Sequence, residues 1–125
     1  MSIVLSILIM LSISCGISNS SIEKSKETIS RFYHKLNTSD NDSLSTIFSY
    51  KFMEKDSAKE WVNEINNGRK VWGAFKNYEF TGVRYSTKNC QLTAYVHYAN
   101  QVNVEKFVLV SENDTMKIIY FAINP

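Results

Sequence analysis

The sequence predicts a single α+β domain, in which three N-terminal helices pack on a curved four-stranded antiparallel sheet. Apolar residues recur with helical spacing in the first half of the chain and with strand-like alternation from Asn77 onward. Short polar turns separate the alternating segments, which is typical of hairpins. The chain is long enough for one core and too short for two.

Residues 1–15 are predicted to be an export signal. The apolar run over residues 3–11 is shorter than the roughly 20 residues that span a bilayer, but it matches a signal-peptide core of about 7–15. The small-residue pattern Ser12-Ile13-Ser14 then precedes Cys15, and this ending resembles the lipobox of bacterial lipoproteins. The resemblance implies that Cys15 is acylated after cleavage. An ordinary secretory signal and a buried helix of the mature domain remain alternatives.

The expected mature protein is held at a membrane in the bacterial cell envelope by its lipid anchor, or is secreted or periplasmic if the anchor is absent. Residues 16–21 are serine-rich and predict a flexible tether, which leaves residues 22–125 as the folded domain. Acylation of Cys15 would leave Cys90 without a partner for an internal disulfide. A net charge of +2 and the lack of a basic cluster argue against nucleic acid as a partner.

Two helices are predicted before the central glycine-containing helix. Ser20 and Glu23 form a capping-box pair, and an apolar stripe then predicts a helix over Ile22–Leu36. Its members are Ile29, Phe32, Tyr33 and Leu36. After a polar turn, one face of a short second helix is predicted from Leu44, Ile47 and Phe48.

The third predicted helix begins at a second capping box, Ser57 with Glu60, and ends at Gly73. Its stripe is Trp61, Ile65, Gly68 and Trp72. A glycine inside a helix costs about 1 kcal/mol relative to alanine, so we expect Gly68 to allow close approach of a sheet or another helix. The two tryptophans are interpreted as core residues, with a ligand platform as the alternative.

Four strands are predicted over Tyr78–Ser86, Gln91–Ala99, Asn103–Ser111 and Met116–Ile123. Turns at Lys88-Asn89, Asn100-Gln101 and Asn113-Asp114 set an expected register in which Ala99 faces Val102 and Ser111 faces Met116. The register places Leu109 beside Ile118, Phe107 beside Tyr120 and Glu105 beside Val96 and Ala122. A β-bulge is required at Gly82 to keep the first strand in phase. The expected inner face comprises Tyr78, Phe80, Val83, Tyr85, Leu92, Ala94, Val96, Phe107, Leu109, Ile118 and Tyr120.

This order of elements is similar to that of the nuclear-transport-factor-like superfamily, also called SnoaL-like or cystatin-like. The leader, the Glu60-Trp61-Val62 helix and the Trp72-Gly73 ending resemble its small uncharacterised bacterial lipoproteins. The resemblance implies a sheet wrapped into a cone with an apolar pocket, and dimers formed through the outer sheet face. It implies no catalytic residue, because no catalytic motif is present, and we predict neither a cofactor nor a metal site.

Glu105 is the one charged residue that the register turns inward, and it is the candidate centre of a ligand site. The expected ligand-binding residues are Glu105, Tyr98, Asn103 and Tyr120. Glu105 could bind a polar ligand, act as a base with a raised pKa, or lie at the solvated rim. His97 faces outward in this register, which argues against the inward histidine of the dehydratases of this superfamily.

The outer sheet face is predicted to be too apolar to remain in water. We expect a homodimer or partner contact there through Tyr95, Lys106, Val108 and Phe121, with Lys106 between two aromatic rings. Three functions stay open. They are a non-enzymatic domain that binds a small molecule, peptide or protein; an isomerase-like or hydrolase-like enzyme that uses Glu105; and an inhibitor or immunity-type protein that acts through its surface.

Overall fold

The computed structural model describes residues 20–36, 46–54 and 57–125. Residues 20–36 are helical and are followed by α2 (Tyr50–Glu54) and α3 (Ser57–Trp72). The strands are β1 (Phe75–Tyr85), β2 (Cys90–Tyr98), β3 (Val102–Glu112) and β4 (Thr115–Ile123). They form one antiparallel sheet in the order β1-β2-β3-β4. The predicted α+β class, with three helices before a four-stranded sheet, is confirmed.

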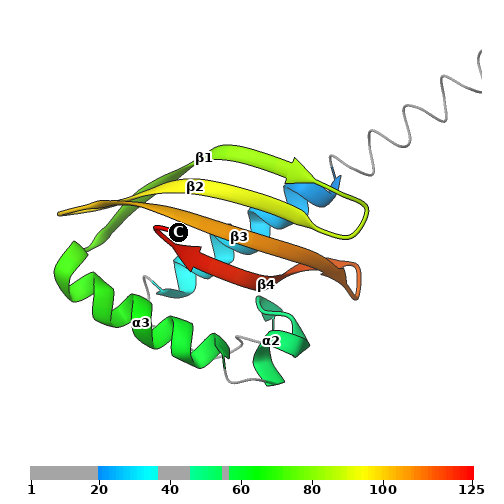
Figure 1. The fold of residues 1–125 in the computed structure, drawn as a ribbon, viewed down its shortest axis with the longest axis horizontal. Helices are drawn as coiled ribbons and strands as arrows, with labels where there is room; N and C mark the ends of the chain where they lie inside the picture. Colours follow the sequence, from blue (N-terminus) through cyan, green and yellow to red (C-terminus); the bar gives the residue numbers. More distant parts are fainter. Residues whose placement is uncertain (1–19, 37–45, 55–56) are drawn as a thin grey trace, which may run out of the picture.

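The helices leave one face of the sheet uncovered in the described part of the chain. The first helix, residues 20–36, passes behind β1, β2 and β3, while α2 and α3 lie below β4 (Figure 1). No helix in the described ranges is long and apolar enough to span a membrane. The predicted leader and Cys15 lie outside the described residues, as does the predicted tether apart from residues 20 and 21, which are helical.

The first helix buries the stripe that its sequence predicts. Ile29, Phe32, Tyr33 and Leu36 are all buried. Phe32 lies at the centre of the core, with its ring 5.8 Å from that of Phe107 and 5.3 Å from that of Phe121. Burial of such side chains contributes about 1.5–3 kcal/mol each, so this contact fixes the helix on the inner face of the sheet.

The short second helix is displaced from its predicted position. Ile47 and Phe48 are buried, but they precede α2: residues 46 and 47 lie in a turn, and Phe48 forms an isolated parallel bridge with Ile118 of β4. Leu44 lies outside the described residues. The backbone N–H of Ser49 donates to the carbonyl of Ile118 at 2.8 Å, and the N–H of Ile118 donates to Ile47 at 2.8 Å. In this segment, hydrogen bonding to the open edge of β4 therefore outweighs the helical spacing of the apolar residues.

The third helix ends at Trp72 as predicted, because Gly73 adopts the left-handed conformation (φ 87°) and its N–H donates to the carbonyl of Arg69. The expected role of Gly68 is wrong. A Cβ at Gly68 would collide with the indole ring of Trp72, so the glycine admits a side chain of its own helix and not another element. The rings of Trp61 and Trp72 pack on Phe121 and Tyr98, which confirms their core role.

The β3–β4 hairpin begins in the predicted register. Asn113 and Asp114 both have positive φ (53° and 61°), as a two-residue type I′ turn requires, and Leu109 pairs with Ile118. The pairing then shifts by one residue, so that Phe107 pairs with Phe121 and not with Tyr120. This bulge reverses the side-chain directions predicted for the end of β4.

The β2–β3 hairpin turns one residue earlier than predicted. The N–H of Tyr98 donates to Gln101 at 2.8 Å, so Ala99 and Asn100 form the loop, and His97 pairs with Val102. The N–H of Asn100 also donates to the carbonyl of Trp72 at 2.7 Å, which ties this loop to the end of α3. Each residue of β3 therefore pairs with a β2 residue two positions earlier than predicted, as Glu105 does with Ala94 in place of Val96. Because the shift is two residues, each side chain keeps its predicted face.

The predicted bulge in β1 is confirmed. The β1–β2 register shifts between Phe80 and Gly82, with Phe80 opposite Ala94 and Gly82 opposite Thr93. Because of this shift, Tyr78 and Phe80 share the inner face with Val83 and Tyr85, as the sequence predicted.

Candidate functional site

Glu105 lies in the interior, in the first half of β3. Its side chain is 0 % exposed, and its strand neighbours are Ala94 on β2 and Ile123 on β4. The predicted inward direction is confirmed, and the alternative of a solvated rim position is wrong. The predicted neighbours Val96 and Ala122 are replaced because of the two register shifts described above.

Three donors converge on the carboxylate. The hydroxyl of Tyr33 donates to Oε1 at 2.6 Å, and the hydroxyl of Tyr98 donates to Oε2 at 3.0 Å. The side-chain amide of Asn103 donates a longer bond to Oε2, at 3.4 Å. Tyr98 and Asn103 were expected beside Glu105, whereas Tyr33 reaches it from the first helix. Every buried polar side-chain atom of the described residues has a hydrogen-bond partner.

Burial and hydrogen bonding act in opposite directions on Glu105. Removal from water raises the pKa of its carboxyl group, and the hydrogen bonds from Tyr33, Tyr98 and Asn103 offset part of that increase. The pKa values of both tyrosines are also raised, first by burial and then by the nearby carboxylate. Both hydroxyls therefore stay protonated and remain donors over the ordinary pH range.

The side-chain amides of Gln101 and Asn124 hold the Asn103 amide in place. Asn103 Oδ1 accepts from Gln101 Nε2 at 2.6 Å and from Asn124 Nδ2 at 3.2 Å. Asn124 Oδ1 accepts in turn from the N–H of Val104 at 2.8 Å. These bonds orient the Asn103 amide so that its nitrogen points toward Glu105. The network therefore extends from the buried carboxylate to the end of β4.

Aromatic rings fill the space around the network. The ring of Tyr33 stacks on those of Phe75 and Tyr78 at 5.1 and 4.9 Å, and its edge meets Phe107. The ring of Tyr98 lies 5.0 Å from that of Trp72. A ligand could reach the carboxylate only by displacing these rings or the donors. The arrangement is suited to holding a buried carboxylate in place, and proton exchange with a substrate would require the core to open.

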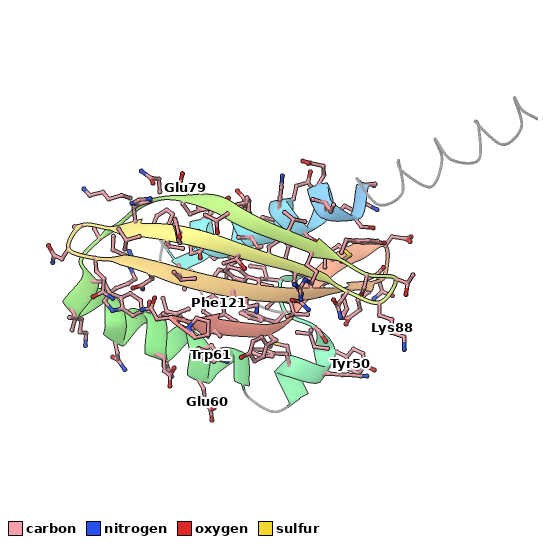
Figure 2. The ribbon with its side chains drawn as sticks, turned by 45° about the horizontal axis from the view of Figure 1, so that its top comes forward. Tyr50, Glu60, Trp61, Glu79, Lys88 and Phe121 are labelled. Carbon is pink, nitrogen blue, oxygen red and sulfur yellow. The ribbon has the colours of Figure 1, made fainter. Side chains whose placement is uncertain are left out.

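Two of the predicted site residues lie on the opposite face from the one expected. Tyr120, expected to line the pocket, is 51 % exposed on the outer face, and Phe121, expected outside, is 0 % exposed. Figure 2 shows Phe121 beside Trp61, and their rings are 5.4 Å apart. The one-residue shift after Leu109 exchanges their positions. Tyr120 therefore does not join Glu105, and Phe121 cannot flank Lys106.

The outer sheet face carries a mixed apolar surface. Tyr95 is 44 % exposed there, and Val102 and Tyr120 are also exposed, while Val104 and Val108 are half-buried. Lys106 pairs with Thr93 and Ala122, so the predicted placement between two aromatic rings is wrong. His97 faces outward as predicted, with Nε2 3.5 Å from a carboxylate oxygen of Glu79. We call this surface the outer face and define it by Thr93, Tyr95, Val102, Val104, Lys106, Val108 and Tyr120.

Comparisons with protein-family models, curated proteins and solved structures find no match to this chain. The candidate site is therefore assigned on geometry alone. Of the three donors to Glu105, Tyr33 is the one that was not predicted as a site residue. Its signal was a hydroxyl within the apolar stripe of the first helix, because a buried tyrosine usually finds a hydrogen-bond partner.

Proposed function

We propose that the protein is a non-enzymatic accessory protein, anchored in the bacterial cell envelope through Cys15, that binds a protein partner through the outer face. The observation that carries the proposal is the contrast between the two faces of the sheet. The inner face is closed around a fully hydrogen-bonded carboxylate, whereas the outer face presents Tyr95 and Tyr120 to solvent.

The interior offers poor support for an enzyme. A general acid or base must come within hydrogen-bond reach of its substrate, but Glu105 already accepts bonds from three protein groups and is inaccessible. A raised pKa is common at catalytic carboxylates. Here burial accounts for it, and the group lies within a packed core. The same packing argues against a ligand pocket in a cone.

The outer face has the composition of a protein interface. Tyrosine is enriched at such interfaces because it combines a large apolar area with a hydroxyl and few rotatable bonds. Tyr95 and Tyr120 lie on β2 and β4, with Val104 and Val108 on β3 between them. A partner that covered this surface would bury a continuous patch at the centre of the sheet. A second copy of the chain is one such partner.

The anchor is tested in the whole cell. We expect the chain, expressed with its leader in a bacterium, to partition with membranes and to incorporate a labelled fatty acid. Cys15→Ser should abolish the label and release the protein from the membrane. Membrane association that persists in the variant without any acylation would contradict the anchor.

The outer face is tested by site-specific photocrosslinking in the same cells. A benzoylphenylalanine residue at position 95 or 120 should give a discrete adduct, with the mass of a dimer if the partner is a second copy. Tyr50 is the matched control, because it is 57 % exposed but lies on α2, away from the sheet face. Equal adducts from position 50, or none from 95 and 120, would contradict the proposal.

A further inference from the structure

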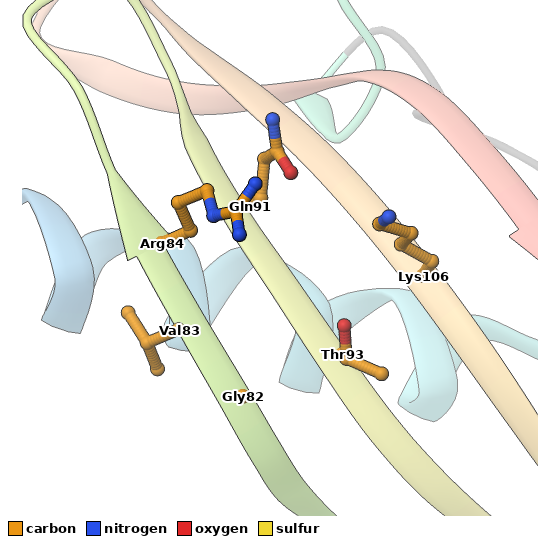
Figure 3. A pocket seen from close by; sticks show the side chains of 6 residues that line it. All are labelled: Gly82, Val83, Arg84, Gln91, Thr93 and Lys106. Atoms are coloured by element: carbon orange, nitrogen blue, oxygen red, sulfur yellow. The ribbon is translucent and has the colours of Figure 1, made fainter.

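A hollow of about 260 Å³ lies on the outer face beside the bulge of β1. It is lined by Gly82, Val83, Arg84, Gln91, Thr93 and Lys106. Figure 3 shows the side chains of Arg84, Gln91, Thr93 and Lys106 in front of the strands, with the first helix behind them. The hollow is therefore on the side of the sheet opposite the buried carboxylate.

The missing side chain at Gly82 helps to form this hollow. Gly82 pairs with Thr93, and a Cβ at position 82 would meet Thr93 Cβ at 3.8 Å, an ordinary contact. Among the described glycines, Gly73 has a positive φ angle and Gly82 does not, so the backbone at Gly82 does not require glycine. A larger residue could therefore occupy the hollow without strain in the main chain.

Two cationic side chains, Arg84 and Lys106, line the hollow without an anionic partner among the described residues. Neither Arg84 nor Lys106 makes a hydrogen bond or ion pair with any residue in the described ranges. Arg84 is exposed and Lys106 is half-buried. The polar side chains of Gln91 and Thr93 lie between them on β2. Two unpaired cations beside polar groups are complementary to an anion, most of all to a planar carboxylate that the guanidinium can bind through two hydrogen bonds.

The number of cations decides which anionic partner fits. Recognition of anionic lipid typically uses clusters of about 4–8 Lys and Arg, and nucleic acid requires an extended basic surface. The hollow has two cations, and apolar and aromatic residues of the outer face adjoin it. A protein segment can supply both a carboxylate for the cations and apolar side chains for Tyr95 and Tyr120.

We infer that the Arg84–Lys106 hollow is an anion subsite that receives an aspartate or glutamate side chain of the protein partner. The inference rests on the proposed function and deepens it, because it names the chemistry of one contact on the outer face. The carboxylate lies between Arg84 and Lys106, and neighbouring residues of the partner cover Tyr95 and Tyr120.

The test is an NMR titration of the full chain, held in a non-ionic detergent, with an acetylated and amidated hexaglutamate peptide. Amide shifts should localise to Arg84, Gln91, Thr93 and Lys106. The double variant Arg84→Glu with Lys106→Glu should weaken binding by about tenfold or more. The control reverses two exposed lysines outside the hollow, Lys76→Glu with Lys88→Glu, and should bind less than about threefold more weakly, although its net charge is the same.

A charge-neutral variant separates the hollow from general attraction. Gly82→Leu should fill the hollow and weaken peptide binding as the charge reversal does, while both cations remain. Equal loss in the control variant, or unchanged binding in Gly82→Leu, would overturn the inference. So would inorganic phosphate binding to the same residues at lower concentrations than the peptide, which would favour a lipid headgroup or free phosphate. If crosslinking from positions 95 and 120 persists in the Arg84→Glu, Lys106→Glu variant, the outer face remains an interface and the subsite alone is wrong.

Discussion

Replacing Glu105 with alanine is expected to lower the free energy of unfolding by about 3–5 kcal/mol. The substitution would leave the hydroxyls of Tyr33 and Tyr98 and the amide of Asn103 without their acceptor in a closed interior. A buried polar group without a partner costs about 1–3 kcal/mol. Chemical denaturation monitored by circular dichroism measures the change.

Two controls separate the network from a general effect of losing a carboxylate. Glu105→Gln keeps the volume and can still bond to hydroxyl groups, so it should cost less than about 1.5 kcal/mol. Glu64→Ala removes an exposed carboxylate from the middle of α3 and should change stability by less than about 0.5 kcal/mol. If Glu105→Ala were no more destabilising than Glu64→Ala, the carboxylate would not hold the core.

The second large effect is expected at Phe121. Its ring lies 4.7 Å from that of Phe107 and contacts Phe32 and Trp61, so it joins the sheet to both long helices. Phe121→Ala should therefore cost about 3–5 kcal/mol, as other buried phenylalanine truncations do.

The adjacent residue is its natural control. Tyr120 is 51 % exposed on the other face of the same strand, so Tyr120→Ala should cost less than about 1 kcal/mol. Comparing the free energies of unfolding of the two variants under identical conditions tests the one-residue register shift in β4. Equal losses of stability, or a larger loss for Tyr120→Ala, would support the register without a bulge.

The sequence predicted the elements whose chemistry is local. The left-handed Asn113-Asp114 turn, the glycine that ends α3 and the bulge at Gly82 are each required by backbone geometry or by side-chain alternation. The stripe of the first helix is equally clear, because helical spacing with a buried aromatic pair leaves little ambiguity.

The errors arose where tertiary contacts decided between locally equivalent arrangements. A register shift of two residues leaves every side chain on its predicted face, so alternation could not locate the β2–β3 loop, which bonds to the end of α3. The bulge before Tyr120 lacks a glycine to mark it. It is stabilised by the burial of Phe121 among rings from three other elements.

The buried half of the site was predictable in part. Alternation placed Glu105, Tyr98 and Asn103 on one face, and a two-residue shift did not disturb that result. The contact from Tyr33 depends on how the first helix lies across the sheet, which no local pattern specifies. The Arg84–Lys106 hollow depends on the pairing of Gly82 with Thr93 and of Thr93 with Lys106, and the predicted register did not contain the second pair.

The raised pKa of Glu105 determines how the stability of the protein depends on pH. A carboxyl group with a higher pKa in the folded state than in the unfolded state binds its proton more tightly when folded. Its contribution to stability is therefore complete below the unfolded pKa and is lost as the pH rises through the folded pKa. The wild type should lose stability relative to Glu105→Gln over that interval.

The most direct measurement is the carbon-13 NMR titration of the Glu105 side-chain carboxyl in the full chain, with the exposed Glu60 as the reference for solvent access. A closed, structural network predicts that Glu105 titrates above its ordinary pKa of 4.5. Its resonance should also remain unbroadened by a water-soluble paramagnetic probe that broadens that of Glu60. Titration of Glu105 at its ordinary pKa, with broadening equal to that of Glu60, would show that solvent reaches the carboxylate and would contradict a closed inner face.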